Sequence, residues 1–154
     1  MARICDITIK QQAGYNYISI RKTINFMAEF THFTFESFHK IQQFLTSISV
    51  LVSDGPIICF HNMDLEHLDI EVGFPIAQDI AVKEDLQFNK IPAQKVVVTI
   101  DLGAYEKQDS TLEALISFIQ THDYKITGPI YYQYLNDINR PAEQYLTKMM
   151  IPIE

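Results

Sequence analysis

Tyrosines on an expected strand are the residues of this sequence best suited to hold a flat organic molecule. Tyr131, Tyr132 and Tyr134 fall within four positions, directly after the breaker Gly128-Pro129. A strand that packs one face on a core needs only one apolar face, because successive side chains alternate in direction. The second aromatic face, formed by Tyr132 and Tyr134, therefore predicts contact with a ligand.

Carboxylates are the second group that could do chemistry. Glu71 alternates with Ile70 and Val72 on an expected strand, with Asp69 on the same side, and Asp101 ends another strand. Carboxylates at such positions are usually solvated, since an acid is rarely buried without a partner. A functional carboxylate would be desolvated and paired with the charge of a ligand. We therefore take Glu71 as a ligand-binding candidate and as a weak candidate for a catalytic acid; the catalytic residues are otherwise unknown.

Cys59 and His61 share a strand face, but neighbouring positions on one face lie about 7 Å apart along the backbone. This spacing predicts a buried neutral thiol instead of a histidine-activated nucleophile. The stretch from His61 to Asp69 is rich in histidine and acids, yet its spacing matches no ligand motif such as H-E-x-x-H. We expect a polar loop there and no metal site.

Composition limits the classes of partner. The formal charge of −7 and the pI near 5.1 argue against a nucleic-acid surface, which needs clustered Lys and Arg, and favour positively charged small partners. The two cysteines form no C-x-x-C, which is typical of a reducing compartment. With no leader-like start and no apolar run of roughly 18 residues, the sequence predicts a soluble, cytoplasmic protein without a membrane segment. No phosphate-cradling glycine loop or G-x-S-x-G occurs, and we expect no cofactor.

Hydrophobic periodicity predicts an α+β fold. A first series comprises strands over 17–24, 57–61 and 68–76, with an amphipathic helix that starts at Thr34 as N-cap. A second comprises strands over 95–101, 130–135 and 144–153, with a helix that starts in a capping box, Ser110 to Glu113. A short alternating run over 5–10 precedes both.

The two series form an internal repeat. Gly55-Pro56-Ile57 recurs as Gly128-Pro129-Ile130, at a numbering offset of 73, and Phe74-Pro75-Ile76 matches Ile151-Pro152-Ile153, at an offset of 77. The order strand-helix-strand-strand therefore occurs twice, over about 15–77 and 92–154 of a single domain. A three-stranded unit leaves one sheet face poorly covered. Two units are thus expected to associate about a pseudo-twofold axis, around a central ligand cleft.

Alternation then assigns side chains to the cleft. If Tyr131 and Gln133 lie under the helix, Ile130, Tyr132 and Tyr134 face the cleft; the opposite assignment stays open. Applying the numbering offset of 73 between the two Gly-Pro-Ile matches predicts that Ile57, Cys59 and His61 of the first unit also face the cleft. Tyr105, in the turn before the second helix, and Phe30, expected before the first helix, are further candidates to line the cleft.

Three segments of the second half resemble the GyrI-like small-molecule-binding domain family: Ile100 to Tyr105, Gly128 to Asp137, and Thr147 to Ile153. The resemblance covers nearly the whole chain and implies two units around a cleft that accepts flat, hydrophobic, often cationic compounds. The family includes effector-binding domains of multidrug-responsive transcription regulators and standalone members. Some of the standalone members are hydrolases of cyclopropane-containing toxins, and one is a gyrase inhibitor.

One departure from the family bears on function. Many members have a glutamate two residues before the tyrosine that matches Tyr134, where this sequence has Tyr132. Tyrosine, with a pKa of about 10, is no base near neutral pH, but it can stack and contribute about 0.5–2 kcal/mol of cation–π attraction. We therefore expect a standalone binding protein for hydrophobic, cationic aromatic compounds, in multidrug or xenobiotic sequestration or sensing, and we favour binding over catalysis while the enzyme question stays open. The alternatives are a hydrolase of electrophilic cyclopropane-type toxins, and a gyrase-inhibitor-like module whose protein partner is unknown.

Overall fold

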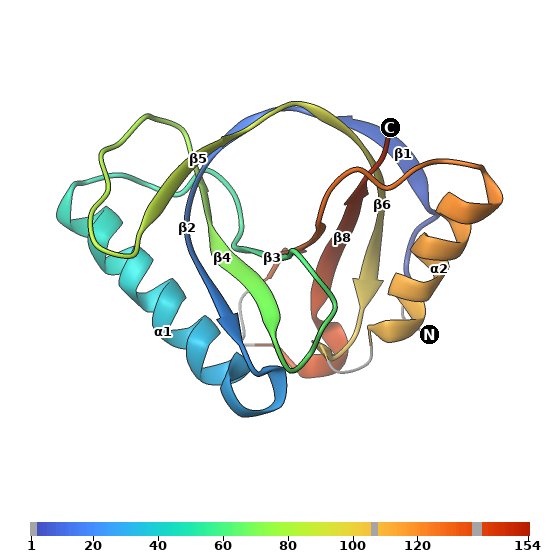
Figure 1. Cartoon of the computed structure of the whole chain (residues 1–154), viewed down its shortest axis with the longest axis horizontal. Coiled ribbons are helices and arrows are strands. Elements are labelled where there is room, and N and C mark those ends of the chain that lie inside the picture. The colour runs from blue at the N-terminus through green and yellow to red at the C-terminus, as the bar shows by residue number, and fades with distance from the viewer. Residues whose placement is uncertain (1–2, 106–107, 137–139) are drawn as a thin grey trace. The chain divides into compact units, whose positions relative to one another are not determined.

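Two compact units make up the chain in the computed structural model, which describes residues 3–105, 108–136 and 140–154. The central unit spans residues 14–92, and the terminal unit combines residues 1–13 with residues 93–154. Each unit has one α-helix beside an antiparallel sheet (Figure 1). Neither helix in the described part of the chain has a segment long and apolar enough to cross a membrane.

The central unit has a four-stranded sheet with the order β3-β4-β2-β5. Antiparallel pairing brings its longest strands, β2 and β4, together along nearly their whole length. The elements of this unit are β2 (Tyr15–Ile24), α1 (Phe26–Ser47), β3 (Ile57–Phe60), β4 (Leu68–Ile76) and β5 (Gln87–Ile91).

Helix α1 begins well before the expected N-cap, so the prediction that it starts at Thr34 is wrong. Asn25 is the N-cap: its Oδ1 accepts from the Ala28 N–H at 3.0 Å, and Glu29 Oε1 accepts from the Asn25 N–H at 3.1 Å. These bonds satisfy free backbone donors at the helix start. Thr34 instead donates its hydroxyl to the Phe30 carbonyl one turn earlier, inside the helix.

One stripe of α1 packs on the central sheet. The buried positions of the helix are four residues apart, and Phe38 lies edge-on to Phe74 of β4, with ring centroids 5.3 Å apart. Ile70 and Val72 share the parity of Phe74, so these side chains form the helix face of the sheet. The buried helix residues are Phe33, Ser37, Ile41 and Leu45.

The terminal unit has the sheet order β7-β8-β6-β1, again fully antiparallel. Its core joins Leu115 and Ile119 of α2 to Val97, Met149 and Ile151 of the sheet. The elements are β1 (Thr8–Gln12), β6 (Gln94–Leu102), α2 (Asp109–Thr121), β7 (Ile130–Tyr134), the 3-10 turn Ala142–Gln144 and β8 (Leu146–Pro152).

Both units contain strand-helix-strand-strand in chain order, as the repeat predicts; the pseudo-twofold relation between them stays a prediction. Two details differ from expectation. Periodicity does not predict strand β5, because Gln87–Ile91 alternates weakly at a sheet edge. The capping box is also wrong: α2 begins at Asp109 after Gln108, which forms no side-chain cap bond and instead donates to Thr147 at 2.8 Å.

Candidate functional site

A polar cluster lies on the helix-distal face of the central sheet, which we define as the face opposite α1. Antiparallel register places Cys59 of β3 directly opposite Glu71 of β4, and Glu71 opposite Arg21 of β2. The backbone N–H of His61 bonds to the Asp69 carbonyl at 2.9 Å, so the ladder continues one residue past β3. Backbone pairing within one unit thus fixes where Cys59, His61 and Glu71 stand.

Glu71 is a buried carboxylate with two side-chain partners. Ser19 donates its hydroxyl to Oε2 at 2.5 Å, and His61 Nε2 lies 2.8 Å from Oε1. Burial by itself would raise the pKa of Glu71, but the hydrogen bonds from His61 and Ser19, with the positive potential of His61 and Arg21, hold that pKa below its ordinary value. The side chain is therefore a buried anion at neutral pH.

Cys59 lies closer to His61 than the backbone spacing of about 7 Å suggests, and its thiol is buried, as predicted. The Sγ atom is 3.5 Å from Nε2, because His61 stands just beyond the strand end, where its ring can turn back. Glu71 contacts the same nitrogen, however. A nucleophile relay requires the acid and the nucleophile on opposite ring nitrogens, so this arrangement does not form one.

Arg21 and Asp69 form an ion pair next to the cluster. The guanidinium donates from Nε at 2.8 Å and from Nη2 at 2.7 Å to the two carboxylate oxygens. This hydrogen-bonded pairing lowers the pKa of Asp69 against a smaller opposing effect of burial. Asp69 thus balances the charge of Arg21 and leaves Glu71 as the carboxylate with a histidine partner.

The polar stretch after His61 is a turn, as predicted. Asp64 Oδ1 accepts from the backbone N–H groups of Glu66 and His67 at 3.1 and 3.3 Å, and Asn62 bonds to the backbone of His67 and Asp69. These side chains close the β3–β4 connection, and their polarity is thereby explained by turn chemistry.

The tyrosines of β7 lie on the other side of their sheet from the one predicted. Tyr132 packs with Ile130 against the core that α2 forms with Met149, and Tyr134 pairs with Thr147, which contacts Gln108 at the start of α2. The face assigned to the cleft is thus the helix face of the terminal sheet. Burial raises the pKa of both phenols, with nearby Asp109 contributing at Tyr132.

A one-residue slip in the repeat explains why Tyr132 and Cys59 lie on different faces of their sheets, although the repeat matches them to each other. In the ladders, Ile57 pairs with Gly73, and Tyr131 pairs with Met150. Gly73 and Met150 keep the predicted offset of 77, but the numbers of Ile57 and Tyr131 differ by 74, not by 73. Since side chains alternate, a shift of one residue exchanges the two faces. The counterpart of Cys59 by pairing is therefore Gln133, not Tyr132.

The remaining two candidates, Tyr105 and Phe30, make their ring contacts within their own units. Tyr105 contacts Tyr134 and Tyr145 of its own unit, with ring centroids 4.8 Å away in each case. Phe30 lies within α1, where its ring is 4.8 Å from that of Phe26. The prediction that Phe30 precedes the helix is wrong, because the Asn25 cap starts the helix earlier.

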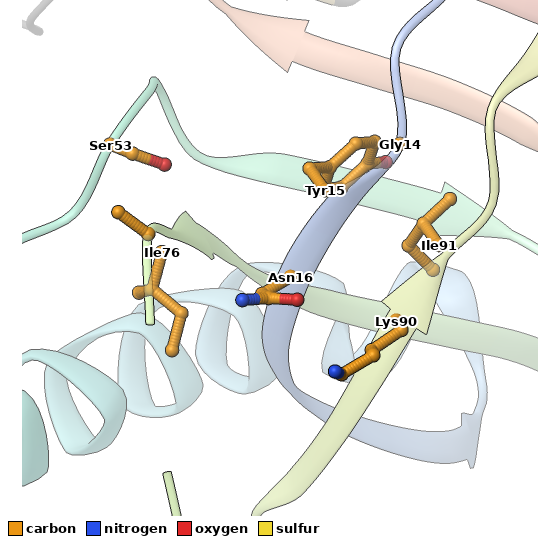
Figure 2. A pocket seen from close by; sticks show the side chains of 8 residues that line it. Gly14, Tyr15, Asn16, Ser53, Ile76, Lys90 and Ile91 are labelled. Atoms are coloured by element: carbon orange, nitrogen blue, oxygen red, sulfur yellow. The ribbon is translucent and has the colours of Figure 1, made fainter. Parts of the chain in front are cut away.

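A hollow of about 470 Å³ occurs at another part of the central unit, between the ends of β2 and β5. Figure 2 shows Asn16 and Lys90 on these neighbouring strands, with Ile76 and Ser53 beside them. The Asp79 carboxylate accepts from Asn16 Nδ2 through Oδ1 at 3.4 Å, and its Oδ2 lies 3.3 Å from Lys90 Nζ. None of the predicted site residues lines this hollow.

Two residues near Glu71 were missed as site candidates. Ser19 bonds to the carboxylate, and Tyr17, two positions earlier on β2, shares the same face and donates its hydroxyl to the Ile57 carbonyl at 3.2 Å. Alternation within residues 17–24 does predict a polar side with Ser19 and Arg21. The register that sets this side against Glu71 is not readable from one strand alone.

Solved structures of three proteins share this fold at low sequence identity. The C-terminal domain of EcmrR matches with a TM-score of 0.85 and 16% identity, covering 97% of both chains. EcmrR in its complex with DNA matches with a TM-score of 0.86 and 16% identity. That match covers 97% of this chain but 57% of EcmrR. SAV2435, solved with tetraphenylphosphonium bound, matches with a TM-score of 0.64 and 16% identity, covering 97% of this chain and 94% of SAV2435. A hydrolase from Listeria innocua gives a TM-score of 0.68 and 13% identity, covering 97% and 92%.

Comparison by sequence gives the family directly. No curated protein matched the chain. The model of the GyrI-like small-molecule-binding domain, in contrast, matches residues 6–154, nearly the whole sequence. This match agrees with the resemblance carried by the segments around Gly103, Gly128 and Pro152. The chain belongs to the GyrI-like family of small-molecule-binding domains.

Proposed function

We propose that this protein binds hydrophobic aromatic cations and that the Glu71 carboxylate supplies the negative charge. The observation that carries the proposal is that Glu71 is buried, yet has a pKa held below its ordinary value by His61 and Ser19. The Ser19 hydroxyl donates to Oε2, and His61 Nε2 lies 2.8 Å from Oε1, so two hydrogen bonds hold the carboxylate in its ionised form. A buried anion of this kind attracts a cation that has shed much of its water.

Further support comes from the surroundings of Glu71 and from the family. Tyr17, which is fully buried, places an aromatic ring on the same helix-distal face, two positions before Ser19. The net charge of −7 favours the approach of cations. SAV2435, a structural neighbour, was solved with tetraphenylphosphonium, a hydrophobic aromatic cation. We therefore assign the ligand contact predicted for Tyr132 to the cluster of Glu71 and Tyr17. We further propose that the protein binds its ligand for sequestration or sensing.

Calorimetric titration of the chain with tetraphenylphosphonium tests this proposal. We expect a dissociation constant of about tens of micromolar or tighter, with much weaker binding of triphenylphosphine oxide, a neutral compound of similar shape. Glu71→Gln keeps the size of the side chain but removes its charge, and should weaken tetraphenylphosphonium binding about tenfold or more.

Glu66→Gln is the matched control, since it changes the net charge equally but lies in the exposed β3–β4 turn. Its affinity for tetraphenylphosphonium should stay within about twofold of the parent chain, because exposed charges are screened. Equal losses in the two variants would show that only the overall field matters. No heat of binding in the parent chain would reject the proposal itself.

A further inference from the structure

The side chains of Cys59, His61 and Glu71 also meet the requirements of a different kind of site. Their ligand-type atoms, Sγ, Nε2 and a carboxylate oxygen, all lie within 4.8 Å of one another. Within the described residues, this is the single group of three or more His, Cys, Asp or Glu side chains that converge in this way. The three come from two adjacent strands of the central unit, so one backbone ladder positions them all.

The distances fit the coordination geometry of zinc. Bonds of about 2.3 Å to sulfur and about 2.0–2.1 Å to nitrogen and oxygen, at tetrahedral angles, place S and N about 3.5 Å apart and N and O about 3.3 Å apart. Cys59 Sγ and His61 Nε2 are already 3.5 Å apart. Nε2 and Oε1 of Glu71 are 2.8 Å apart and need to separate by only about half an ångström.

A supporting contact orients the carboxylate. The Ser19 hydroxyl donates to Oε2 of Glu71, which leaves Oε1 directed toward His61 and Cys59. Such outer hydrogen bonds fix the orientation of a metal ligand and are typical of sites that hold an ion tightly. Ser19 is fully buried on β2, where the ladder with Gly73 fixes its position.

The local charges also suit a divalent ion. A cysteine thiolate and the Glu71 carboxylate together supply two negative charges once the metal displaces the thiol proton. Arg21, on the same face, would repel a cation, but its guanidinium is paired through two hydrogen bonds with Asp69. The sulfur donor disfavours magnesium and calcium, which take oxygen ligands, and favours zinc among the available divalent ions.

We propose that Cys59, His61 and Glu71 form a three-residue site for Zn²⁺, with the fourth position open to water or another small ligand. This goes beyond the binding of organic cations and differs from the expectation of no metal site. The sequence does not reveal the site, because Cys59-x-His61 and Glu71 are joined only by the register of β3 and β4.

Metal titration of the chelator-treated full chain tests the site. We expect about one Zn²⁺ per chain, with a dissociation constant of about 1 μM or tighter in competition with a chromophoric chelator. Co²⁺, which binds in the same geometry, should give a thiolate-to-cobalt charge-transfer band that Zn²⁺ abolishes. Cys59→Ser should remove this band. It should also weaken zinc binding more than the loss of a residue that only hydrogen-bonds to a ligand, which typically costs about 10- to 100-fold in affinity.

Two variants serve as matched controls. Cys5→Ser removes the other cysteine, which lies in the terminal unit, and His67→Asn removes a histidine of the β3–β4 turn. Both should bind zinc like the parent chain. Ser19→Ala keeps all three ligands and should weaken binding about 10- to 100-fold, the expected cost of an outer contact. Loss of the cobalt band in Cys5→Ser, or no zinc binding by the folded parent chain, overturns the proposal.

A second measurement avoids dependence on the folding of a Cys59 variant. In Cys5→Ser, Cys59 is the one remaining thiol of the sequence, and Zn²⁺ should slow its alkylation at least about tenfold because the metal-bound thiolate is shielded. An unchanged alkylation rate at saturating zinc contradicts the site.

The same titrations separate this proposal from the organic-cation function. Tetraphenylphosphonium binding is measured with a chelator present, so it stands or falls without zinc. If both proposals hold, Zn²⁺ should weaken tetraphenylphosphonium binding, since both ligands use the Glu71 carboxylate. If Glu71→Gln weakens tetraphenylphosphonium binding, zinc binding that leaves tetraphenylphosphonium affinity unchanged would place the metal elsewhere and overturn the assignment to Cys59, His61 and Glu71.

Discussion

Asp101 carries a carboxyl group whose burial should be measurable through its pH dependence. Its Oδ1 accepts from the Thr111 hydroxyl at 2.6 Å, while Oδ2 has no hydrogen-bond partner among the described residues. Burial raises the pKa of Asp101 above its ordinary value, and the Thr111 bond offsets this only in part. The folded chain therefore holds this proton to a higher pH than the unfolded chain does.

The consequence is a loss of stability as pH rises. From about pH 4, the ordinary pKa of an aspartate, up to the raised pKa of the folded state, the free energy of unfolding falls, and above that value the penalty is constant. Asp101→Asn removes the titration but keeps an oxygen for Thr111. Relative to the parent chain, this variant should gain stability between about pH 4 and pH 7. Urea denaturation at several pH values measures the difference.

Asp85→Asn is the control of opposite sign. Lys40 bonds to Asp85 at 2.6 Å and lowers the pKa of that carboxyl, so the pair stabilises the fold above the ordinary pKa and stops doing so as pH falls. Asp85→Asn should therefore lose stability relative to the parent as pH rises. If Asp101→Asn showed this same trend, the carboxyl of Asp101 would not be held protonated by burial.

For individual residues, the sequence predicts which residue types could form the site better than it predicts their contacts. Glu71 can be chosen as a candidate because an acid alternating with Ile70 and Val72 must lie opposite a buried side. Its partners cannot be named, because Ser19 and His61 reach it through pairing between strands. The contact between Cys59 and His61 is missed for a related reason: the backbone spacing does not describe a ring at a strand end, which can turn back.

Among the elements, the β2–β4 ladder depends on one glycine. A Cβ atom at Gly73 would lie 2.0 Å from the Ile18 carbonyl oxygen and 2.8 Å from Ser19 Cα. Both are backbone atoms of the neighbouring strand, so no side-chain rotation relieves the contact. Gly73→Ala should force β2 and β4 apart and lower the free energy of unfolding by about 1–3 kcal/mol or more.

Gly128→Ala provides the comparison for Gly73→Ala. There the added Cβ would meet the ring of Pro152 at 3.1 Å, a side chain that can shift by a few tenths of an ångström. Its loss of stability, measured by the same urea denaturation, should be clearly smaller than that of Gly73→Ala. Equal losses would mean that the backbone contact at Gly73 costs no more than the side-chain contact at Gly128. Because Gly73 pairs with Ser19, the Gly73 variant should also weaken ligand binding at Glu71.

The sequence predicts most elements but not which way they face. Apolar periodicity identifies both helices and six strands, because burial in each unit enforces it. It misses β5, an edge strand with little apolar character, and it reverses the faces of β7. Matching the two Gly-Pro-Ile segments aligns the units at a numbering offset of 73. Hydrogen bonding of β3 to β4 and of β7 to β8 aligns the same strands at an offset of 74, so the two alignments differ by one residue. That one residue decides whether Cys59 and Tyr132 are expected on the same face of their sheets or on opposite faces.

At the scale of the whole chain, the terminal unit is assembled from both ends of the sequence. Strand β1 pairs with β6 from Thr8↔Val98 to Gln12↔Gln94, so the whole central unit lies between the two partners in the sequence. The central unit, by contrast, is one continuous segment. Local sequence patterns contain no information on a pairing this distant, which is why the repeat predicts units over 15–77 and 92–154 without β1.

Breaking the β1–β6 pairing should therefore affect one unit selectively. Lys10→Pro removes a backbone donor of the Lys10↔Val96 pair in the middle of the ladder, because the even-numbered residues of β6 bond toward β1 and the odd-numbered ones toward β8, and proline is poorly tolerated at hydrogen-bonded strand positions. Hydrogen exchange followed by mass spectrometry should show faster exchange in β6, with peptides from β2 and β4 little changed. Because Glu71 lies on β4, the variant should keep its zinc and tetraphenylphosphonium contacts from the central unit. Equal loss of protection in β4 and β6 would show that the two units unfold together, and the terminal strand would then stabilise the binding residues as much as its own sheet.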